Sequence, residues 1–368
     1  MSPEPLTSQR FGDLPVKRVI FAIPGKLDTP TGGYIYDRMV VDGLRDSGWH
    51  VDVVGLGEGY PAPDEPTRLR ALDLLASLPH PCPVIIDGLA YGVMPEARKH
   101  LHPANPIIAL VHHPLALETG VSHAQAQLLQ TRETLALSYA AEVIVTSPST
   151  VRELVDRYCV DEQRLTVICP GTERVNRYAN ISSNPTVRFL SVGAIVPRKG
   201  FMALVHALKP LANLDWSLNI VGDTTRSPPT TRELSQAIEQ AGLAPRIRML
   251  GIQSKSDLER LYVESDVFVL ASEHEGYGMA YAEAIAHGLP IIGTRAGAIP
   301  DTVPSIAGLL VAPGNVDELS RALARLISDV DFRQSLAAGA REVAASLPTW
   351  SDAIKQFESV LGRVILLD

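Results

Sequence analysis

The chain has 368 residues, of which 46% are hydrophobic and 20% are charged, and its formal net charge at pH 7 is −8. That composition is typical of a globular protein, and the length exceeds what one ordinary hydrophobic core accommodates, so two domains are expected. The negative charge argues against nucleic acid as the main partner and against adhesion of the whole molecule to an anionic membrane. Peripheral membrane contact through a local basic patch stays open.

The cysteines and the N-terminal residues indicate a reducing location. Cys82, Cys159 and Cys169 are odd in number and show no CxxC spacing, so neither a disulfide framework nor a zinc site is expected. The N-terminal sequence MSPEPLTSQRFGDLP lacks the apolar core of a signal peptide, and no apolar run approaches the length of a membrane span. We therefore expect a cytoplasmic protein without a transmembrane segment.

The first half of the chain alternates short apolar strands with helices, which is the pattern of a parallel α/β domain. Strands are expected at residues 16–24, 50–54, 84–87, 107–111, 143–146 and 164–168, and helices at 125–140 and 150–158. The loop after the first strand, residues 25–33, ends in Gly32 and Gly33 and leads into a helix up to about residue 46. It lacks the G-x-G-x-x-G fingerprint of dinucleotide binding, so NAD is not predicted. A plain turn and a loop that faces a ligand both fit its two glycines.

Two consecutive histidines, His112 and His113, follow the expected strand at 107–111. The carboxyl end of a parallel strand is where ligands bind, and two imidazoles there favour a functional role over a chance hydrogen bond. Adjacent residues on an extended chain point to opposite faces, so a shared metal ion is not expected and only one histidine should face a cleft. Glu118 is interpreted as a surface carboxylate, with orientation of a histidine or acceptor binding as the alternatives.

A second series of strands and helices begins at residue 187, after a polar segment at 178–185 that suits a linker. Its strands are expected at residues 189–196, 216–221, 246–250, 267–270 and 308–311, and its helices at 254–264, from 315 onward and from 349 to about 367. Ser254 is the expected cap of the helix at 254–264. The series repeats the α/β pattern of the first half.

Arg198 and Lys199 lie beyond the strand at 189–196, in the sequence VPRKG, at the expected start of a helix. Two cations at that end of a helix oppose its dipole, so an anionic partner is favoured over a solvated surface pair. We take pyrophosphate as the anion that these cations bind.

The stretch from residue 267 to residue 301 reads as strand, loop, helix and strand, with the helix at 279–287. Glu275 precedes a glycine-rich turn, where the backbone can approach a ligand closely. The amides of Gly278, Met279 and Ala280 open the helix and remain unpaired within it. They suit a phosphate, which the helix dipole would also favour.

Glu283 is the only charged residue in this otherwise apolar helix. Burying a lone carboxylate costs several kcal/mol unless it is paired or accepts hydrogen bonds. Sugar or ribose hydroxyls are suitable donors. A salt bridge to a neighbouring strand, or a position on a solvated stripe, fits the residue equally well.

Glu275 and Glu283 have seven residues between them, in the setting EGYGMAYAEAIAHGLPII. This resembles the E-x7-E signature of retaining glycosyltransferases of the GT-B fold, in particular glycosyltransferase family 4. The resemblance implies that Glu275 holds hydroxyls of the donor sugar and Glu283 the ribose of the nucleotide. It also implies that His112 contacts the transferred sugar, and that Arg198 and Lys199 hold the donor diphosphate.

The resemblance further implies a fold of two Rossmann-like, doubly wound parallel-sheet domains that face a cleft, with the C-terminal helix crossing back to the first domain. The first domain would comprise residues 1–174 plus 350–368 on the acceptor side, and the donor-binding domain residues 175–349. Glycines of the loop at 25–33 would face the donor phosphates. One departure is Ala194, since many family members carry arginine at that position.

The implied activity is transfer of a hexose-type sugar from a nucleotide donor, a UDP- or GDP-sugar, to an acceptor hydroxyl, with retention of configuration and without a metal or other cofactor. The catalytic residues would be His112, Arg198, Lys199 and Glu275, and the substrate-binding residues Gly32, Gly33, His113, Gly278, Met279, Ala280 and Glu283. The acceptor, whether a glycan, a lipid-linked sugar or a small molecule, is open. The alternatives are a nucleotide-sugar epimerase or inverting transferase on the same scaffold, and a non-catalytic two-lobed sugar-binding protein.

Overall fold

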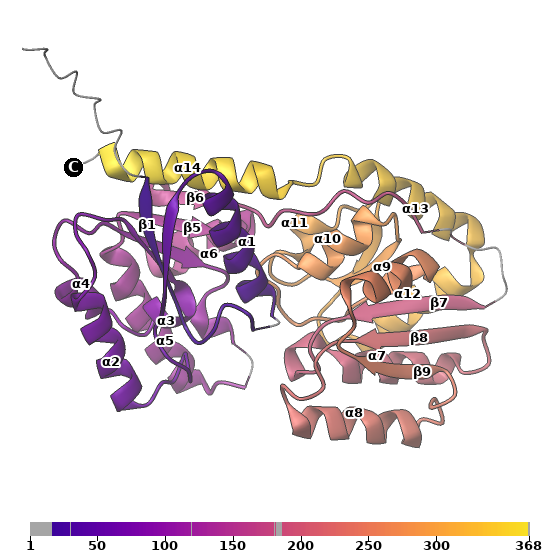
Figure 1. Cartoon of the computed structure of the whole chain (residues 1–368). Coiled ribbons are helices and arrows are strands. Elements are labelled where there is room, and N and C mark those ends of the chain that lie inside the picture. Colours follow the sequence, from indigo (N-terminus) through magenta and orange to yellow (C-terminus); the bar gives the residue numbers. More distant parts are fainter. Residues whose placement is uncertain (1–16, 30, 119, 180, 182–185, 367–368) are drawn as a thin grey trace, which may run out of the picture.

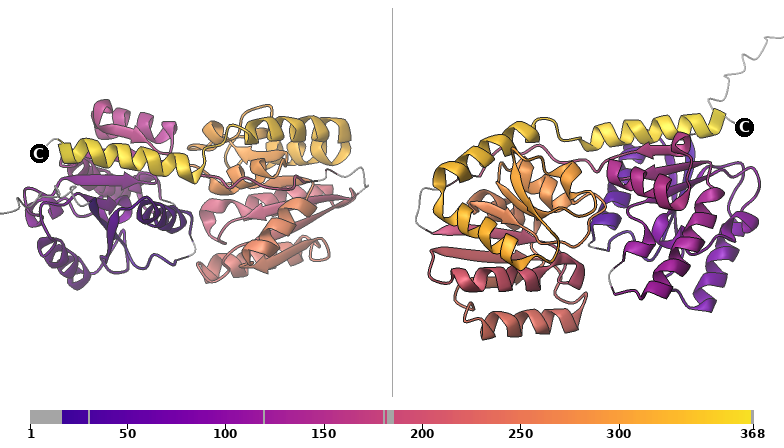
Figure 2. Two further views of the ribbon diagram at one scale, coloured as in Figure 1. Left: turned by 45° about the horizontal axis from the view of Figure 1, so that its top comes forward. Right: turned by 180° about the vertical axis from the view of Figure 1, so that it is seen from behind.

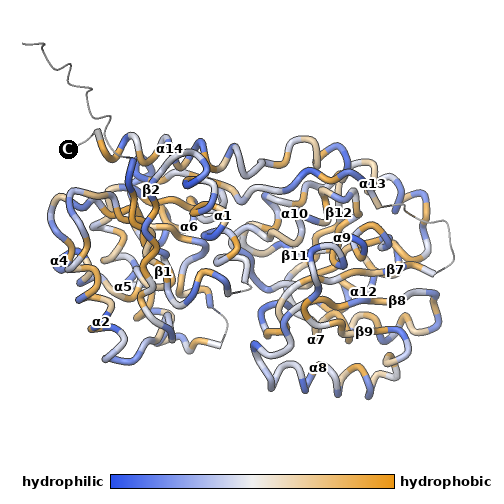
Figure 3. The backbone as a smooth tube through the Cα atoms, viewed as in Figure 1, coloured by the Kyte–Doolittle hydropathy of each residue, from blue (hydrophilic) through white to orange (hydrophobic). Residues whose placement is uncertain are grey.

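The computed structural model describes residues 17–29, 31–118, 120–179, 181 and 186–366. Two six-stranded sheets lie side by side, each flanked by helices (Figure 1). Hydrophobic residues concentrate on the strands, while the long C-terminal helix alternates hydrophobic and hydrophilic residues (Figure 3). The expected α/β, two-domain GT-B architecture is confirmed.

The first sheet has the order β2-β1-β3-β4-β5-β6, and all its neighbouring strands pair in parallel. Its strands are β1 (Arg18–Ile23), β2 (His50–Gly55), β3 (Val84–Asp87), β4 (Ile107–Val111), β5 (Glu142–Val145) and β6 (Leu165–Val167). The helices with them are α1 (Gly32–Asp46), α2 (Glu65–Ala76), α3 (Gly88–Tyr91), α4 (Ala97–His100), η1 (Leu115–Leu117), α5 (His123–Ser138), α6 (Pro148–Tyr158) and η2 (Glu162–Arg164). Alternate strand residues enter separate cores, so that Phe21 packs with α1 while Ile20 packs with α2, α5 and α6.

The second sheet has the order β12-β11-β10-β7-β8-β9 and is also parallel throughout. Its strands are β7 (Val187–Val192), β8 (Trp216–Val221), β9 (Ile247–Gly251), β10 (Val267–Val269), β11 (Ile291–Thr294) and β12 (Gly308–Val311). Its helices are η3 (Pro197–Lys199), α7 (Phe201–Leu208), η4 (Lys209–Leu211), α8 (Pro228–Gln240), α9 (Lys255–Glu264), α10 (Met279–Ala286), α11 (Ile299–Thr302), α12 (Val316–Ser328) and α13 (Val330–Ala344). The expected cap is present, since the side chain of Ser254 accepts from the amide of Asp257.

The segment after β7 differs from the sequence prediction. The strand ends at Val192, and Arg198 and Lys199 lie in the short turn η3 rather than at the start of a helix. Gly200, at φ 68°, separates this turn from α7, and a Cβ at that position would lie 1.9 Å from the carbonyl oxygen of Ala271. The close approach requires glycine and breaks the helix there. The two cations therefore do not oppose a helix dipole from its first turn.

The last helix, α14 (Trp350–Leu366), runs back across the first sheet domain (Figures 1 and 2). It packs against α1, and Phe357, Val360 and Leu361 are buried in the core that also contains Phe21. The aromatic ring of Tyr36 lies 6.1 Å from that of Phe357. The expected return of the C-terminal helix to the first domain is thereby confirmed.

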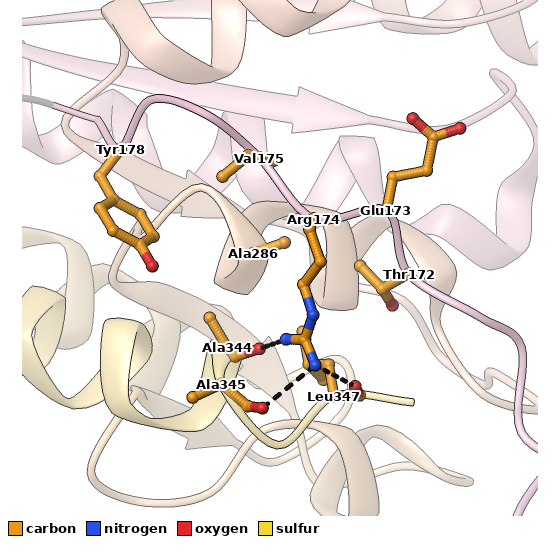
Figure 4. Close-up of a pocket in the computed structure, with 9 residues that line it drawn as sticks. All are labelled: Thr172, Glu173, Arg174, Val175, Tyr178, Ala286, Ala344, Ala345 and Leu347. Carbon is orange, nitrogen blue, oxygen red and sulfur yellow. Dashed lines mark hydrogen bonds between the residues drawn. The ribbon is translucent and has the colours of Figure 1, made fainter. Parts of the chain in front are cut away.

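The segment that joins the two sheets is fastened where the chain returns to α14. The amide of Thr172 donates to the carbonyl of Pro348 at 2.8 Å. The guanidinium of Arg174 donates to the carbonyls of Ala344, Ala345 and Leu347 beside a cavity of about 60 Å³ (Figure 4). That volume is far below the roughly 300 Å³ or more of small-molecule sites. We therefore interpret this cavity as part of the segment that joins the two domains, and not as a substrate site. Across the described residues no helix is both long and apolar enough to cross a membrane.

Candidate functional site

The predicted site residues lie at the topological switch points of the two sheets. In the first sheet the chain continues from β1 to β2 on one side and to β3 on the other, and in the second sheet β7 divides β8 from β10 in the same way. Loops beyond the carboxyl ends of such strands form the ligand-binding crevice of doubly wound folds. The loops that follow β1, β4, β7 and β10 carry nearly all the predicted residues.

The two sets of loops contact each other across the domains. The carbonyl oxygen of His112 accepts a hydrogen bond from Thr146 Oγ1 at 3.0 Å, and the same hydroxyl lies 3.3 Å from the carbonyl oxygen of Gly276. A Cβ on Gly276 would lie 1.9 Å from that His112 oxygen, so only glycine permits this approach. A Cβ on Gly32 would lie 3.8 Å from Met279 Sδ, and one on Gly33 would lie 3.3 Å from the His112 ring. The structure therefore brings the glycine loop, His112 and the start of α10 together.

His112 is held by two carboxylates that the sequence did not single out. Its Nε2 lies 3.1 Å from Asp37 Oδ1 and 3.4 Å from Asp87 Oδ2, and both aspartates are buried. The ring also meets that of Tyr36 edge to face at 5.3 Å. The two carboxylates at Nε2 and the ring of Tyr36 together position the imidazole without help from a ligand.

The two carboxylates determine the charge of this imidazole. Burial alone would lower the pKa of His112, but Asp37 and Asp87 outweigh it and raise that pKa to about 10. Burial opposes ionisation of Asp87, yet its hydrogen bond with His112 keeps its pKa below the usual value. Burial raises the pKa of Asp37 to about 7, so Asp87 is the carboxylate that stays charged beside the His112 cation at neutral pH, and the imidazolium acts as a hydrogen-bond donor.

The His112 ion pair should make folding stability fall at alkaline pH. Because the pKa is raised from 6.5 to about 10 in the folded state, the stabilisation is fully present below pH 6.5 and is lost as the pH rises to about 10. Each unit of the shift corresponds to about 1.4 kcal/mol. We expect the melting temperature to drop more between pH 7 and pH 10 in the wild type than in His112→Gln, as measured by calorimetry. Equal drops in the two proteins would contradict the ion pair.

His113 has different partners from His112. Its Nε2 lies 2.6 Å from Glu118 Oε1, and its ring lies 5.9 Å from the ring of His274 in the other domain. The two consecutive histidines thus have different carboxylate partners. The interpretation of Glu118 as a mere surface carboxylate is wrong, because it is partly buried and orients His113.

Glu275 is at the centre of a charge cluster in the second domain. Lys199 Nζ lies 2.6 Å from Glu275 Oε1, Arg198 Nη1 lies 3.2 Å from Oε2, and the Ser272 hydroxyl donates to Oε1 at 2.6 Å. Arg198 also donates to the carbonyl of His274 at 2.5 Å. Two cations against one carboxylate leave a net charge of +1 at the carboxyl edge of the second sheet.

The pKa of Glu275 shows that this carboxylate is ionised. Burial would raise the pKa of Glu275, but Lys199 and Arg198 lower it to about 2. Burial lowers the pKa of Lys199, a shift that Glu275 only partly offsets. Ala194 occupies the position where many members of the family that this chain resembles carry arginine. The guanidinium in this cluster comes from Arg198 instead.

The start of α10 lies next to this cluster. Gly278 is the N-terminal cap, at φ 90°, and the first backbone bonds of the helix run from Tyr281 and Ala282 to the carbonyl of Gly278. The amides of Met279 and Ala280 precede those donors, so they have no partner within the helix. They add a second group of anion-binding donors beside the cations.

Glu283 lies one turn further along α10 and is partly buried. Its Oε2 accepts from Tyr262 Oη of α9 at 2.9 Å, and no lysine, arginine or histidine of the described residues pairs with it within 4.0 Å. Burial raises its pKa, and the Tyr262 hydrogen bond acts against that rise. The expected alternative of a salt bridge to a neighbouring strand is therefore not formed by the described residues. Among those residues no side chain donates to Oε1, which suits this oxygen to a ligand hydroxyl.

A cavity of about 370 Å³ separates the two domains beside these residues. The first domain contributes Pro114, Leu117 of η1 and one face of α6 along its whole length, and the second contributes His274, Glu275 and the turn at Gly297. Asp301, from α11, accepts from both the amide and the hydroxyl of Ser149 at 2.8 and 2.6 Å, which holds α6 against the second domain.

One group of described residues has the ligand spacing of a metal site, since the potential ligand atoms of Asp37, Asp87 and His112 lie within 4.8 Å of one another. A histidine must be neutral to bind a metal. The His112 nitrogen that faces the carboxylates is instead paired with them. We interpret the group as an ion-paired cluster, and metal independence stays a prediction.

Three functional neighbours were missed at the sequence level. Asp87 had a signal, because it ends an apolar strand at the same edge of the sheet as His112. His274 had one also, since it directly precedes Glu275. Asp37 had none, because a single aspartate on a helix is usually solvated.

Comparison with protein families and curated proteins gives one reaction class. Residues 176–343 match the family described as glycosyl transferases group 1. The chain is 26% identical to the MMP alpha-(1->4)-mannosyltransferase of Mycolicibacterium hassiacum over 83% of its length and 76% of that protein. It is 27% identical to the D-inositol 3-phosphate glycosyltransferase of Corynebacterium diphtheriae over 61% of its length, which spans 57% of that protein.

Solved structures share the fold. Sucrose-phosphate synthase from Thermosynechococcus elongatus superposes with a TM-score of 0.80 at 22% identity, covering 95% of this chain and all of that one. HepE from Anabaena, in complex with UDP and glucose, superposes with a TM-score of 0.75 at 18% identity, covering 94% and 100% of the two chains. Together with the glycosyl transferases group 1 match over residues 176–343, these findings show that the chain is a glycosyltransferase of the GT-B fold.

Proposed function

We propose that this enzyme transfers a hexose-type sugar from a nucleoside diphosphate donor to an acceptor hydroxyl, with retention of the anomeric configuration and without a metal ion. The observation that carries the proposal is the net positive cluster of Arg198, Lys199 and Glu275 beside the open amides of α10. A doubly negative diphosphate is complementary to that arrangement. Relatives agree with such a donor, since HepE binds UDP-glucose and a corynebacterial relative is named GDP-mannose-dependent.

The cluster lies where negative charge would develop during transfer. Cleavage of a glycosidic bond passes through an oxocarbenium-like state, and the departing diphosphate gains charge as the bond breaks. Lys199, Arg198 and the amides of Met279 and Ala280 would stabilise that charge from fixed positions, and such stabilisation usually contributes most to the rate of charge-separating reactions. These groups supply what a metal ion would otherwise supply.

The protonation of His112 argues against this residue as the base of an inverting transferase. An inverting transferase needs a base that removes the proton of the acceptor hydroxyl. His112 already carries its proton at neutral pH because Asp37 and Asp87 raise its pKa to about 10. It therefore suits a donor of hydrogen bonds to the transferred sugar. In the proposed mechanism the leaving phosphate oxygen takes the acceptor proton on the same face of the ring, the new bond forms on that face, and configuration is retained.

The proposal is tested with the full-length chain and a panel of UDP-, GDP- and ADP-sugars. We expect one donor to raise the melting temperature, because ligand binding to the folded state stabilises it. With that donor and an acceptor, NMR of the product should show the anomeric configuration of the donor, and EDTA should leave the rate unchanged.

Other outcomes would select the alternatives. An inverted product points to an inverting transferase, and conversion of the donor sugar without transfer points to an epimerase. Binding of a sugar without turnover of any donor indicates a binding protein. Loss of activity in EDTA would contradict metal independence. Asp37, Asp87 and His112 would then be the candidate metal ligands.

A further inference from the structure

We propose that Asp301 of the second domain is a positioning residue for the transfer reaction, because it binds the start of α6 in the first domain and so fixes the two halves of the site against each other. The inference goes beyond the proposed function, since it concerns how the domains are held and not which donor is bound. Figure 1 shows α11, which carries Asp301, on the side of the second domain that faces the first.

The first turn of α6 leaves one backbone donor for a partner from outside the helix. Pro148 has no amide hydrogen, and the amide of Thr150 donates to the side chain of Ser147 at 3.2 Å. The amide of Ser149 has no acceptor within the helix, because the first amides of a helix precede its bonding pattern. The first turn also contains no acidic residue, although negative charge is favourable there. This helix end therefore lacks an anionic acceptor of its own.

Asp301 supplies that acceptor from the other domain. Its Oδ2 accepts from the Ser149 amide at 2.8 Å and from the Ser149 hydroxyl at 2.6 Å. Its Oδ1 lies 3.2 Å from Arg152 Nη2, and the same guanidinium donates to Ser149 Oγ at 2.7 Å. Both oxygens of one carboxylate thus contact the first domain. We call Ser149, Arg152 and Asp301 the interdomain clasp.

In the second domain, α11 is fastened to the loop that carries Glu275. The amide of Ala298 donates to the carbonyl of Glu275 at 2.9 Å, and the Thr302 hydroxyl donates to the carbonyl of Tyr277 at 2.6 Å. A Cβ on Gly297 would lie 2.3 Å from the Glu275 carbonyl oxygen, so the turn before α11 packs directly on this loop. Movement of α11 therefore shifts the loop as well.

In the first domain, the start of α6 is fastened to His112. Thr146 directly precedes Ser147, the cap of α6. The Thr146 hydroxyl donates to the carbonyl of His112 at 3.0 Å and lies 3.3 Å from the carbonyl oxygen of Gly276. The clasp therefore holds His112 beside the Glu275 loop. Without the clasp, fewer molecules should have both halves of the site aligned, and the transfer step requires that alignment.

The first test replaces Asp301 by alanine in the full-length chain, with the donor that raises the melting temperature and its acceptor. We expect kcat to fall about tenfold, the lower end for hydrogen bonds to charged groups, because the Asp301 side chain is 22% exposed. The dissociation constants of UDP and GDP should stay unchanged, since Arg198, Lys199 and Glu283 all lie in the second domain. Asp317→Ala, which removes an exposed aspartate from the first turn of α12, is the control and should change neither quantity.

A variant on the first-domain side shows whether Asp301 acts through the clasp. Ser149→Ala keeps the backbone amide, so it should lower kcat less than Asp301→Ala does. The double variant should lower kcat no further than Asp301→Ala alone, because the Ser149 hydroxyl has already lost this partner. Losses that simply add would mean that the two residues act separately, and they would overturn the inference.

Hydrogen exchange tests the clasp without any donor. The Ser149 amide should exchange at least about tenfold faster in Asp301→Ala than in the wild type, because its acceptor is gone. The Thr150 amide, whose acceptor Ser147 lies in the same domain, should keep its rate.

Two results would overturn the inference. One is an equal exchange rate of the Ser149 amide in Asp301→Ala and wild type. The other is a loss of kcat in Asp301→Ala that an equal loss of UDP and GDP affinity accompanies, since Asp301 would then act within the second domain. A protein that turns over no donor would instead refute the proposed function and would leave the exchange result as it is, so the two failures are distinguishable.

Discussion

Replacing Lys199 by alanine is expected to lower kcat about 100- to 1,000-fold, the range found when one fixed donor to a developing charge is removed. Lys199 is partly buried, lies 2.6 Å from Glu275 and belongs to the cluster with net positive charge. Its loss removes a cation from the leaving diphosphate, so the factor should be the same for two donors that differ only in the hexose, such as UDP-glucose and UDP-galactose. Steady-state kinetics on both donors measures this.

Two further variants distinguish this electrostatic role from a structural one. Lys199→Arg keeps the charge and should recover part of the lost rate. Lys17→Ala removes an exposed lysine that pairs with Glu358 away from the cleft, and it should leave kcat unchanged. A loss confined to one of the two hexoses would mean that Lys199 recognises the sugar and not the diphosphate.

Replacing Glu283 by alanine is expected to raise the dissociation constant of the nucleoside diphosphate about 10- to 100-fold. A hydrogen bond to a charged group contributes about 1.5–3 kcal/mol, and 1.4 kcal/mol corresponds to a factor of ten. Tyr262 occupies one oxygen of this carboxylate, and the other receives no hydrogen bond from the described residues. Titration calorimetry with UDP and GDP gives the constants, with Glu239→Ala on α8 as an exposed control.

The ribose contact can be separated from any change in folding. A nucleoside diphosphate without the 2′ and 3′ hydroxyls should bind wild type and Glu283→Ala with nearly equal affinity, because the contact is missing in both complexes. If the variant still weakens that analogue as strongly as UDP, Glu283 does not hold the ribose.

Much of the fold could be predicted because buried parallel strands have a simple pattern. The bounds of β3 and β4 match the predicted ranges, since both are short apolar runs that are buried along their whole length. The strand predicted at 189–196 extends beyond β7, because Ile195 in the loop after Val192 is buried in the core of the second domain. The pattern of apolar residues predicts which residues are buried, but it does not predict which element buries them.

The site was predictable in part for the same reason. Glu275 and Glu283 have a recognisable spacing in the chain, so their positions on the loop and on α10 followed from the sequence. The pairing of His112 with Asp37 joins residues 75 positions apart and depends on how α1 packs on the sheet. Local sequence contains no information about that distance. The ion pairs of Glu275 with Arg198 and Lys199 likewise span 76 positions or more.

The most direct test of the account is a crystal structure of the protein soaked with the nucleoside diphosphate of its donor. We predict the diphosphate at Arg198, Lys199 and the first amides of α10, with the ribose on Glu283. A nucleotide bound at another surface, with the crevice between the two sheets empty, would contradict the account.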